Sequence, residues 1–378
     1  MTDAVAAEPD ARTRRGPFLQ GILPFDRRGL SGEVVAGLTL AALGIPEVMG
    51  YTKIAGMPVV TGLYTILVPL ALFAVLGSSR HLVVGADSAT AAMMAAGIGG
   101  LAAAGSSQYV ALAGVVAITT GVVLIVARLV HLGFLADFLS RSVLVGFLTG
   151  VGIQVALGQV GGMLGISGGT GGTLRKFGYV LAHLGDTDKD SAIISVVVLA
   201  IVLGAKAIDK RIPGALIAVV GMIAASWAWD FAAKGVSTLG PVPGGLPSVS
   251  VPHLDGASMR TILATVAGIV LVILAQSAAT SRAYAAKYRE PFSEDVDLVG
   301  IGAANIAAGL TGTFVVNGSP TKTQMVDGAG GRSQLASLAT SGIVLIVLLF
   351  LTKPLEYMPT FYSTIKYINQ LRQNIYSQ

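Results

Sequence analysis

Long apolar segments recur along the chain, and they restrict what it can fold into more than any other feature. A helix needs about 20 predominantly apolar residues to cross the hydrocarbon core of a bilayer. Charged residues make up only 12% of the sequence, against about 25% in a typical soluble domain. The pattern therefore predicts an all-α polytopic membrane protein. The eleven candidate segments are 31–53, 61–79, 86–104, 109–131, 139–164, 190–207, 212–232, 259–283, 294–311, 318–331 and 333–352.

The composition also excludes several kinds of site. The chain contains no cysteine, which rules out disulfides, thiolate metal ligands and cysteine nucleophiles. None of its four histidines has a partner at metal-ligand spacing, so neither a metal nor another cofactor is expected. No pairing of a nucleophile with a base is recognisable, so we do not expect an enzyme. The formal net charge of +5 indicates basic loops at a membrane surface rather than binding to nucleic acid.

The basic residues indicate how the chain is oriented. Cytoplasmic connections of membrane proteins carry an excess of Lys and Arg. With the N-terminus in the cytoplasm, 14 basic residues fall at cytoplasmic ends of the segments and six at outer ends. Residues 1–30 lack the apolar stretch of a cleaved signal peptide and are expected to form a cytoplasmic N-terminal segment. The connection 165–190 fits least well, because it places three basic residues outside.

Two similar polar interruptions break the apolar pattern. Residues 83–93 read VVGADSATAAM, and residues 315–325, 232 positions later, read VVNGSPTKTQM. They open the third and the tenth apolar segments, which suggests two repeats of seven helices, the second inverted because seven is an odd number. Shortened helices at corresponding positions of inverted repeats point to a transporter site at the bilayer midplane. The alternative is a pair of ordinary surface loops whose similarity is accidental.

The interruptions also contain residues that start helices. Asp87 and Ser319 can act as N-caps, and Pro320 suits a first helical turn. The Val pair before each helix favours extended backbone, so two β-like segments are predicted to pair beneath the site. A helix that begins within the membrane exposes backbone N–H groups and the positive end of its dipole, which suits an anion.

The predicted organisation has five parts. A Gly- and Pro-rich linker separates the two repeats, and the last residues are polar, unlike the rest of the chain. We therefore expect the second repeat to be incomplete. The parts are the N-terminal segment 1–30, the first inverted repeat 31–235, the linker 236–258, the second repeat 259–358 and the atypical tail 359–378.

Several motifs resemble one known family. Residues 44–64, GIPEVMGYTKIAGMPVVTGLY, resemble the first-helix signature of the SulP anion transporters, the bacterial relatives of solute carrier family 26. Residues 79–90 (SRHLVVGADSAT) are similar to the family's third-helix entry, and residues 146–165 to its fifth helix. The linker GPVPGGLP and the later NGSPTKT, with Asn305 before it, also match in order. The agreement runs from about residue 25 to about residue 358.

The resemblance implies a fold and a set of partners. Fourteen spans in two inverted repeats would form a core domain of helices 1–4 and 8–11 and a gate domain of helices 5–7 and 12–14. The family's substrates are small anions: sulfate, bicarbonate, chloride and, in some members, C4-dicarboxylates. A multi-pass protein of the bacterial inner (plasma) membrane follows. Its expected partners are a small inorganic or organic anion, protons, the lipid bilayer and a second copy in a homodimer.

Three features depart from the family's pattern. The last apolar segment ends near residue 351, and the tail resembles neither a twelfth membrane helix nor the cytoplasmic STAS domain of most members. We therefore expect the last helices and the STAS domain to be missing from this sequence. Lys322 stands where the family usually has Arg, which keeps the charge but loses the bidentate geometry. Gln276 stands where an acidic residue is common.

Glu47 and Lys322, two of the charged residues within the predicted spans, are assigned roles in transport. Glu47 is predicted to couple transport to protons, because an ionised carboxylate in a membrane is costly and usually functional. The alternative is a structural carboxyl held by Tyr51. Lys322 is predicted to attract the anion, with an internal ion pair to Asp87 or Asp327 as the alternative. Asp87 and Ser319 are assigned to helix capping or charge balance.

Uncharged residues complete the predicted binding site. Gln276 and Ser277 offer polar groups from the eighth helix, although they could instead bond neighbouring helices together. The predicted substrate-binding residues are Ala89, Thr90, Gln276, Ser277, Thr321, Lys322 and Thr323.

These residues predict a secondary active transporter of small anions, coupled to protons in symport by alternating access. A nucleobase:proton symporter of the same fold is the nearest alternative, but Gln276 and Lys322 replace the acidic residues that it would need. An uncoupled anion channel is disfavoured by Glu47. A membrane scaffold without transport activity is disfavoured by the buried polar residues.

Overall fold

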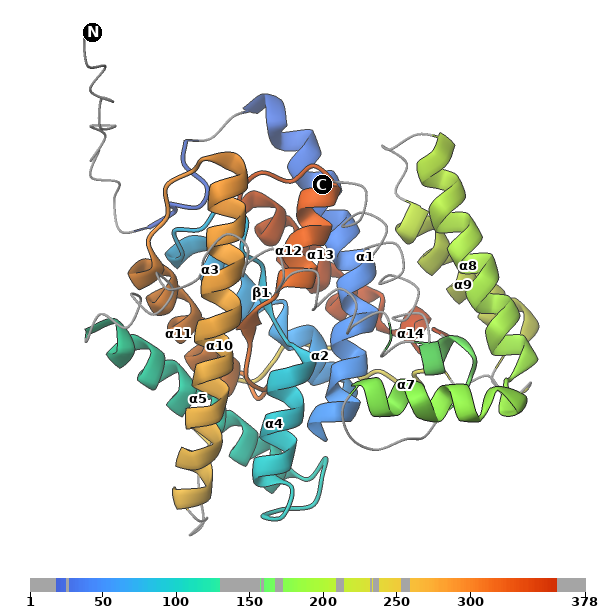
Figure 1. The fold of residues 1–378 in the computed structure, drawn as a ribbon, viewed down its shortest axis with the longest axis horizontal. Helices are drawn as coiled ribbons and strands as arrows, with labels where there is room; N and C mark the ends of the chain where they lie inside the picture. The colour runs from blue at the N-terminus through green and yellow to red at the C-terminus, as the bar shows by residue number, and fades with distance from the viewer. Residues whose placement is uncertain are drawn as a thin grey trace, which may run out of the picture.

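The computed structural model describes residues 18–24, 27–129, 157, 160–166, 173–208, 214–231, 233, 238–252 and 259–358. The predicted tail 359–378 and most of the predicted segment 139–164 lie outside the described residues. Within the described part the chain is mainly helical, with one pair of short strands (Figure 1).

The helices cover most of the predicted membrane segments. Among the described residues, four helical stretches are long and apolar enough to cross a membrane: α1 (Leu30–Ala55), α2 with α3 (Val59–Leu76), α5 (Ser107–Leu129) and α10 (Met259–Tyr288). Shorter apolar helices are α4 (Ser88–Ile98), α13 (Leu335–Phe350) and most of α9 (Gly214–Trp229). The other described elements are η1 (Arg27–Gly29), α7 (Thr173–Ala182), η3 (Leu184–Asp186), α8 (Lys189–Ile208), α11 (Glu294–Leu310), α12 (Pro320–Gly328) and α14 (Thr352–Leu355).

The predicted segment 61–79 is two helices rather than one. α2 (Val59–Thr65) ends before Ile66, and α3 (Val68–Leu76) begins two residues after it. Pro69 lies in the first turn of α3, where its missing N–H breaks no hydrogen bond. In a continuous helix the same proline would leave the carbonyl of Thr65 without a partner. The break at Ile66 is therefore the result of Pro69.

The two interruptions pair with each other. β1 (Val84–Gly85) and β2 (Asn317–Gly318) are antiparallel, with Val84 opposite Gly318 and Gly85 opposite Asn317. The predicted pairing is confirmed, but each strand begins later than expected from its Val pair. In the second strand the reason is Asn305, whose side chain bonds both the N–H and the carbonyl of Val316. These backbone groups are therefore not available to the strand pair.

A short helix follows each strand, as predicted. α4 has 11 residues and α12 has nine. At a rise of about 1.5 Å per residue, neither reaches across a hydrocarbon core of about 30 Å. Each helix therefore has one end within the thickness of the bilayer when the longer helices around it span the membrane.

Helices from the first third of the chain pack on helices from the last third. α1 packs against α13, α5 packs against α10 and α11, and α3 also packs against α11. At the α5–α11 contact a Cβ on Gly121 would lie 2.4 Å from the Gly302 carbonyl oxygen, and a Cβ on Gly309 would lie 2.3 Å from that of Gly114. The missing side chains thus let the two backbones touch, as small residues do in membrane bundles.

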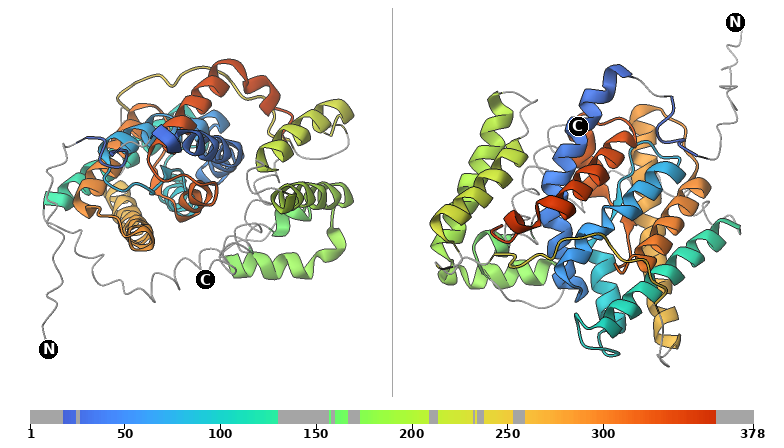
Figure 2. Two further views of the ribbon diagram at one scale, coloured as in Figure 1. Left: turned by 90° about the horizontal axis from the view of Figure 1, so that it is seen from above. Right: turned by 180° about the vertical axis from the view of Figure 1, so that it is seen from behind.

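A second group of helices stands apart from this bundle. Figure 2 shows α7, α8 and α9 to one side of the other helices. α8 packs on α9, and α9 contacts α1. Residues 238–252, which connect this group to the last part of the bundle, contain no helix, as their Pro and Gly content predicts.

Candidate functional site

α4 and α12 both begin beside the strand pair, and a side chain caps each of them. Asp87 Oδ1 accepts the N–H of Ala89 at 2.9 Å, and Ser319 Oγ accepts the N–H of Lys322 at 3.3 Å. Both caps are where the sequence places them. The Ala89 N–H, which the sequence assigns to the substrate, is thus used by Asp87, and a role for it in binding stays a prediction.

Lys322 lies where the strands meet the two helix starts, and it is fully buried. Its Nζ donates to the carbonyl oxygen of Ala86 at 2.7 Å and lies 3.5 Å from Glu47 Oε2. The side chains of Lys322 and Glu47 are 0% and 1% exposed. Tyr51 completes the group: its hydroxyl donates to Glu47 Oε1 at 2.5 Å, and its ring centroid lies 5.1 Å from Lys322 Nζ.

The sequence suggests Asp87 or Asp327 as the partner of Lys322, and Asp87 does interact with it electrostatically, but the closest described carboxylate is a third one. The described ion pair is with Glu47, whereas Asp87 caps α4 and Asp327 bonds Lys287 and Arg332. For Asp327 the reason is its distance along the helix. Asp327 lies five residues beyond Lys322, or about 7.5 Å along the axis of α12, while α1 passes alongside α12.

A second polar group joins α10 to β2. The hydroxyl of Ser277 donates to Asn317 Oδ1 at 3.0 Å and accepts the N–H of Gly318 at 3.2 Å. Asn317 Nδ2 in turn donates to Gln276 Oε1. Gln276 and Ser277 therefore do lie beside the strand pair, and Asn317, which the sequence analysis did not single out, connects them. Asn317 lies opposite Gly85 in the strand pair, and the next residue, Ala86, accepts the hydrogen bond of the Lys322 ammonium.

The three predicted threonines are at the same helix starts. Thr90 is buried and donates to the carbonyl oxygen of Asp87 at 3.3 Å. Thr321 Oγ1 lies 3.0 Å from Ser319 Oγ. Thr323 is buried, and its Oγ1 accepts the N–H of Val83 at 3.0 Å, which fastens the residue before β1 to α12. Contact between these threonines and a substrate stays a prediction.

Asn305 is a further buried amide that supports the site. Its Nδ2 donates to the carbonyl oxygens of Ile301 and Val316, and its Oδ1 accepts the Val316 N–H, each at 3.0 Å. An amide inside an apolar segment is a visible signal, because membrane helices carry such groups only where they find partners. The sequence alone does not show that the partner is the backbone just before β2.

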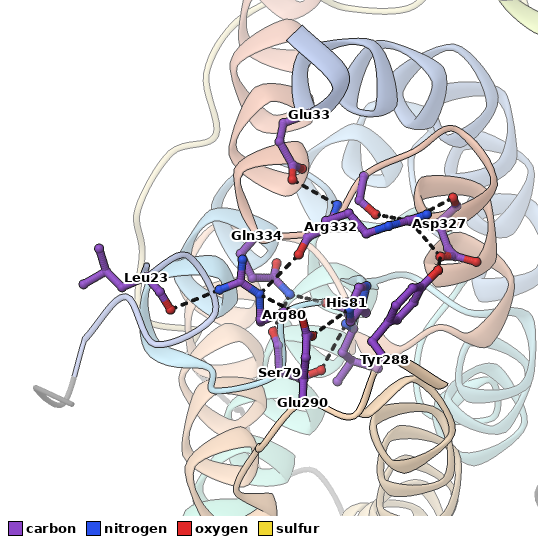
Figure 3. A network of polar contacts seen from close by, with 12 residues as sticks. Leu23, Glu33, Ser79, Arg80, His81, Tyr288, Glu290, Asp327, Arg332 and Gln334 are labelled. Atoms are coloured by element: carbon purple, nitrogen blue, oxygen red, sulfur yellow. Dashed lines mark hydrogen bonds and ion pairs between the residues drawn. The ribbon is translucent and has the colours of Figure 1, made fainter. Parts of the chain in front are cut away.

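A third polar cluster lies at the far end of α12 (Figure 3). Asp327 accepts hydrogen bonds from Lys287 Nζ at 2.6 Å, from an Arg332 guanidinium nitrogen at 2.9 Å and from the Tyr288 hydroxyl. We call it the Asp327 cluster, and its members are Arg80, His81, Tyr284, Lys287, Tyr288, Glu290, Asp327 and Arg332.

His81 is the titratable centre of the Asp327 cluster. One face of its ring stacks on Tyr288 with 4.5 Å between centroids, and its Nε2 lies 2.9 Å from Glu290 Oε2. Burial lowers the pKa of His81 below its usual value, although the neighbouring Glu290 carboxylate works in the opposite direction. His81 therefore favours the neutral form near pH 7.

Comparison with known proteins assigns the chain to a family. A model of the sulfate permease family matches residues 30–363. The chain belongs to this family. A probable sulfate transporter of Mycobacterium tuberculosis is 36% identical over 337 residues, which cover 89% of this chain and 60% of the relative. Probable sulfate transporter 3.4 of Arabidopsis thaliana is 30% identical, and the match covers 90% of this chain and 53% of the relative.

Solved structures share the fold of this sulfate permease family member. The overall structure of SLC26A9 matches with a TM-score of 0.75 at 22% identity, over 94% of this chain and 60% of that one. The transmembrane domain of the cyanobacterial bicarbonate transporter BicA matches with a TM-score of 0.72 at 22% identity, over 93% and 90%. Its family and its apolar helices make the chain a multi-pass membrane protein of a transporter family. It spans between about half and 60% of the length of these curated relatives.

Proposed function

We propose that this chain is the membrane part of a secondary transporter of small anions, with Lys322 as the fixed positive charge of the binding site. The observation that carries the proposal is the fully buried pair of Lys322 and Glu47 between the starts of α4 and α12. Ionisable groups inside a membrane are costly and mark the pathways of ions and substrates. The family and its named relatives support sulfate or bicarbonate as the substrate, and the proposal also includes chloride and C4-dicarboxylates, which the sequence resemblance implies.

Two features make this position suitable for an anion. The N-terminal ends of α4 and α12 both bring the positive ends of their dipoles to the strand pair. Lys322 adds a full charge that water cannot screen, because its side chain is 0% exposed. Its Nζ can form three hydrogen bonds, and the carbonyl oxygen of Ala86 takes one of them.

Glu47 gives the site a means of coupling anion entry to a proton. Without an anion, the Glu47 carboxylate balances the charge of Lys322. An incoming anion competes for the same ammonium group, and the two negative charges repel each other. A proton taken up by Glu47 removes this repulsion, and Tyr51 keeps the carboxyl in place. Anion and proton would then cross together.

The wider architecture forms part of the proposal. The packing of the first part of the bundle on the last, about a central pair of strands, supports two inverted repeats. We assign α1–α5 and α10–α13 to the core domain and α7–α9 to the gate domain, which Figure 2 shows beside it. Movement of the core against the gate would expose Lys322 to each side in turn. The N-terminus is assigned to the cytoplasm, and a homodimer is the proposed assembly.

Uptake into proteoliposomes tests the function, with the natural full-length protein. We expect saturable uptake of radiolabelled sulfate that an inward proton gradient accelerates. Glu47→Gln should remove the acceleration, whereas Lys322→Gln should abolish uptake. If sulfate, bicarbonate, chloride and dicarboxylates all fail to enter, the transporter proposal is wrong. Currents that do not saturate would indicate a channel, and uptake of uracil would indicate a nucleobase symporter.

A further inference from the structure

The hydrogen bonds between α10 and β2 have defined donors and acceptors, which form a chain from Gly318 through Ser277 and Asn317 to Gln276. The backbone N–H of Gly318 can only donate, so Ser277 Oγ acts as its acceptor. The Ser277 hydroxyl donates its single proton to Asn317 Oδ1. Turning the Asn317 amide around would leave this proton without the oxygen that now accepts it. The Ser277 hydroxyl thus holds the Asn317 amide with its Oδ1 toward Ser277 and its Nδ2 toward Gln276.

The orientation of the Asn317 amide determines which group of the Gln276 side chain is available to a ligand. Asn317 Nδ2 is a donor and therefore takes the carbonyl oxygen of Gln276 as its acceptor. The oxygen of Gln276 is used inside the protein, and the NH₂ group, with two donors, is the part of the side chain left to bind another partner. Gln276 is half-buried, whereas Ser277 and Asn317 are buried. An anion such as sulfate or chloride has acceptors only, so a donor suits it.

We infer that Asn317 is a specificity-determining positioning residue, which holds Gln276 as a hydrogen-bond donor toward the anion. This inference rests on the proposed function, because it assumes that an anion binds beside Lys322. Its place in the strand pair makes Asn317 suitable for the role: Asn317 lies opposite Gly85, and the next residue, Ala86, accepts the hydrogen bond of Lys322. Asn317 thus links Gln276 on α10 to the strand pair, one residue from the carbonyl that accepts the Lys322 ammonium.

Asn317→Asp is the variant that reverses the hydrogen bond between residue 317 and Gln276, so that Gln276 becomes the donor. A carboxylate can only accept, so Ser277 still donates to one of its oxygens. Gln276 must then turn its NH₂ group toward the other oxygen and present its carbonyl oxygen to the site. An acceptor in the site disfavours an anion that has acceptors only, and it favours an anion that carries an O–H group.

A comparison of nitrate with bicarbonate separates the effect of the reversed Gln276 amide from the effect of the negative charge that Asn317→Asp adds. Both are planar anions with one negative charge, but only bicarbonate carries an O–H donor. Binding is read from the rise in the thermal unfolding midpoint of the purified full-length protein with anion concentration, which needs no transport. We expect Asn317→Asp to raise the ratio of bicarbonate affinity to nitrate affinity at least about tenfold. The change corresponds to about 1.4 kcal/mol, the size of one good hydrogen-bond preference.

Gln276→Glu is the second variant, in case Asn317→Asp does not fold. It keeps an acceptor for Asn317 and removes the NH₂ group, so we expect the same change of ratio. If neither anion stabilises the wild-type protein, the proposed anion site itself fails. If both anions stabilise the wild type and the ratio stays the same in a folded Asn317→Asp or Gln276→Glu protein, the role of Asn317 is refuted while the anion site stands.

Discussion

At the scale of single residues, the central question is why a fully buried lysine is tolerated. Lys322 has a fully buried ammonium group, and its charge is compensated by the Glu47 carboxylate, the Ala86 carbonyl and the face of the Tyr51 ring. A buried ion pair gains little over two apolar residues, but losing one partner leaves an unpaired charge. The pair is therefore better explained by function than by stability.

The first prediction concerns this pair. Lys322→Gln should destabilise the protein by roughly 3–5 kcal/mol, because Glu47 is left buried without a cation. The double variant Glu47→Gln with Lys322→Gln should recover a large part of the loss, since two neutral amides can bond each other. Thermal unfolding of the wild type, both single variants and the double variant measures the coupling. Losses that simply add would mean that the two side chains do not interact.

The second prediction concerns His81 in the Asp327 cluster. Burial lowers the pKa of His81, so the folded protein binds a proton there less readily than the unfolded chain does. The stability that follows from this is complete above the unfolded pKa of about 6.5 and is lost as the pH falls below it. Between pH 7.5 and 5.5 the unfolding midpoint should therefore fall more in the wild type than in His81→Gln.

Control measurements for His81 use a histidine outside the cluster. His183→Gln, beside α7, measures the effect of losing a histidine that does not contact the Asp327 cluster. The groups that face His81 are Tyr284, Tyr288, Glu290, Asp327 and Arg332. If His81→Gln loses as much stability as the wild type on acidification, these neighbours and not His81 carry the pH dependence.

Part of the site could be predicted from the residue types, and part could not. The caps at Asp87 and Ser319 follow from local sequence, because a cap acts within two or three residues of itself. The pairing of Lys322 with Glu47 joins residues 275 positions apart and depends on how α1 crosses α12. Asn317 was missed for a similar reason, since its partners lie on α10.

At the scale of elements, local signals explain the breaks in the helices better than the contacts between them. The short helices α4 and α12 and the extended segments before them follow from the polar interruptions. The division into α2 and α3 could have been found from Pro69. The later start of β2 could not have been found in this way, because it results from the hydrogen bonds between the Asn305 side chain on α11 and the backbone of Val316.

The third prediction tests the contact between α5 and α11. Gly121→Ala would place a Cβ 2.4 Å from the Gly302 carbonyl oxygen, so the two helices must move apart. We expect a loss of about 1–3 kcal/mol, the usual effect of overpacking. Gly342→Ala in α13 is the matched control, because its Cβ meets no atom within 4 Å. Equal unfolding midpoints for the two variants would show that α5 and α11 are not in backbone contact.

At the scale of the whole molecule, the Asp327 cluster bears on the orientation of the bundle in the membrane. The Asp327 cluster gathers Arg80, Lys287 and Arg332 at the end of α12. α4 leaves the strand pair from the other helix start and ends at Ile98. If α4 and α12 begin at the membrane centre and point to opposite sides, the end with the basic cluster is expected to be cytoplasmic. Apolar periodicity alone predicts the spans but not this direction, which depends on the loop charges.

The last prediction tests this orientation with single introduced cysteines, and the sequence contains no other cysteine that could react. Gly29 precedes α1 and Gly100 follows α4, and a Cβ at either position meets no atom within 4 Å. In intact cells, Gly100→Cys should react with a membrane-impermeant maleimide, because it is assigned to the outside. Gly29→Cys should react only after permeabilisation, which also shows that it is accessible. The reverse result would place the Asp327 cluster outside and overturn the assigned orientation, while two equally reactive cysteines would contradict opposite directions for α4 and α12.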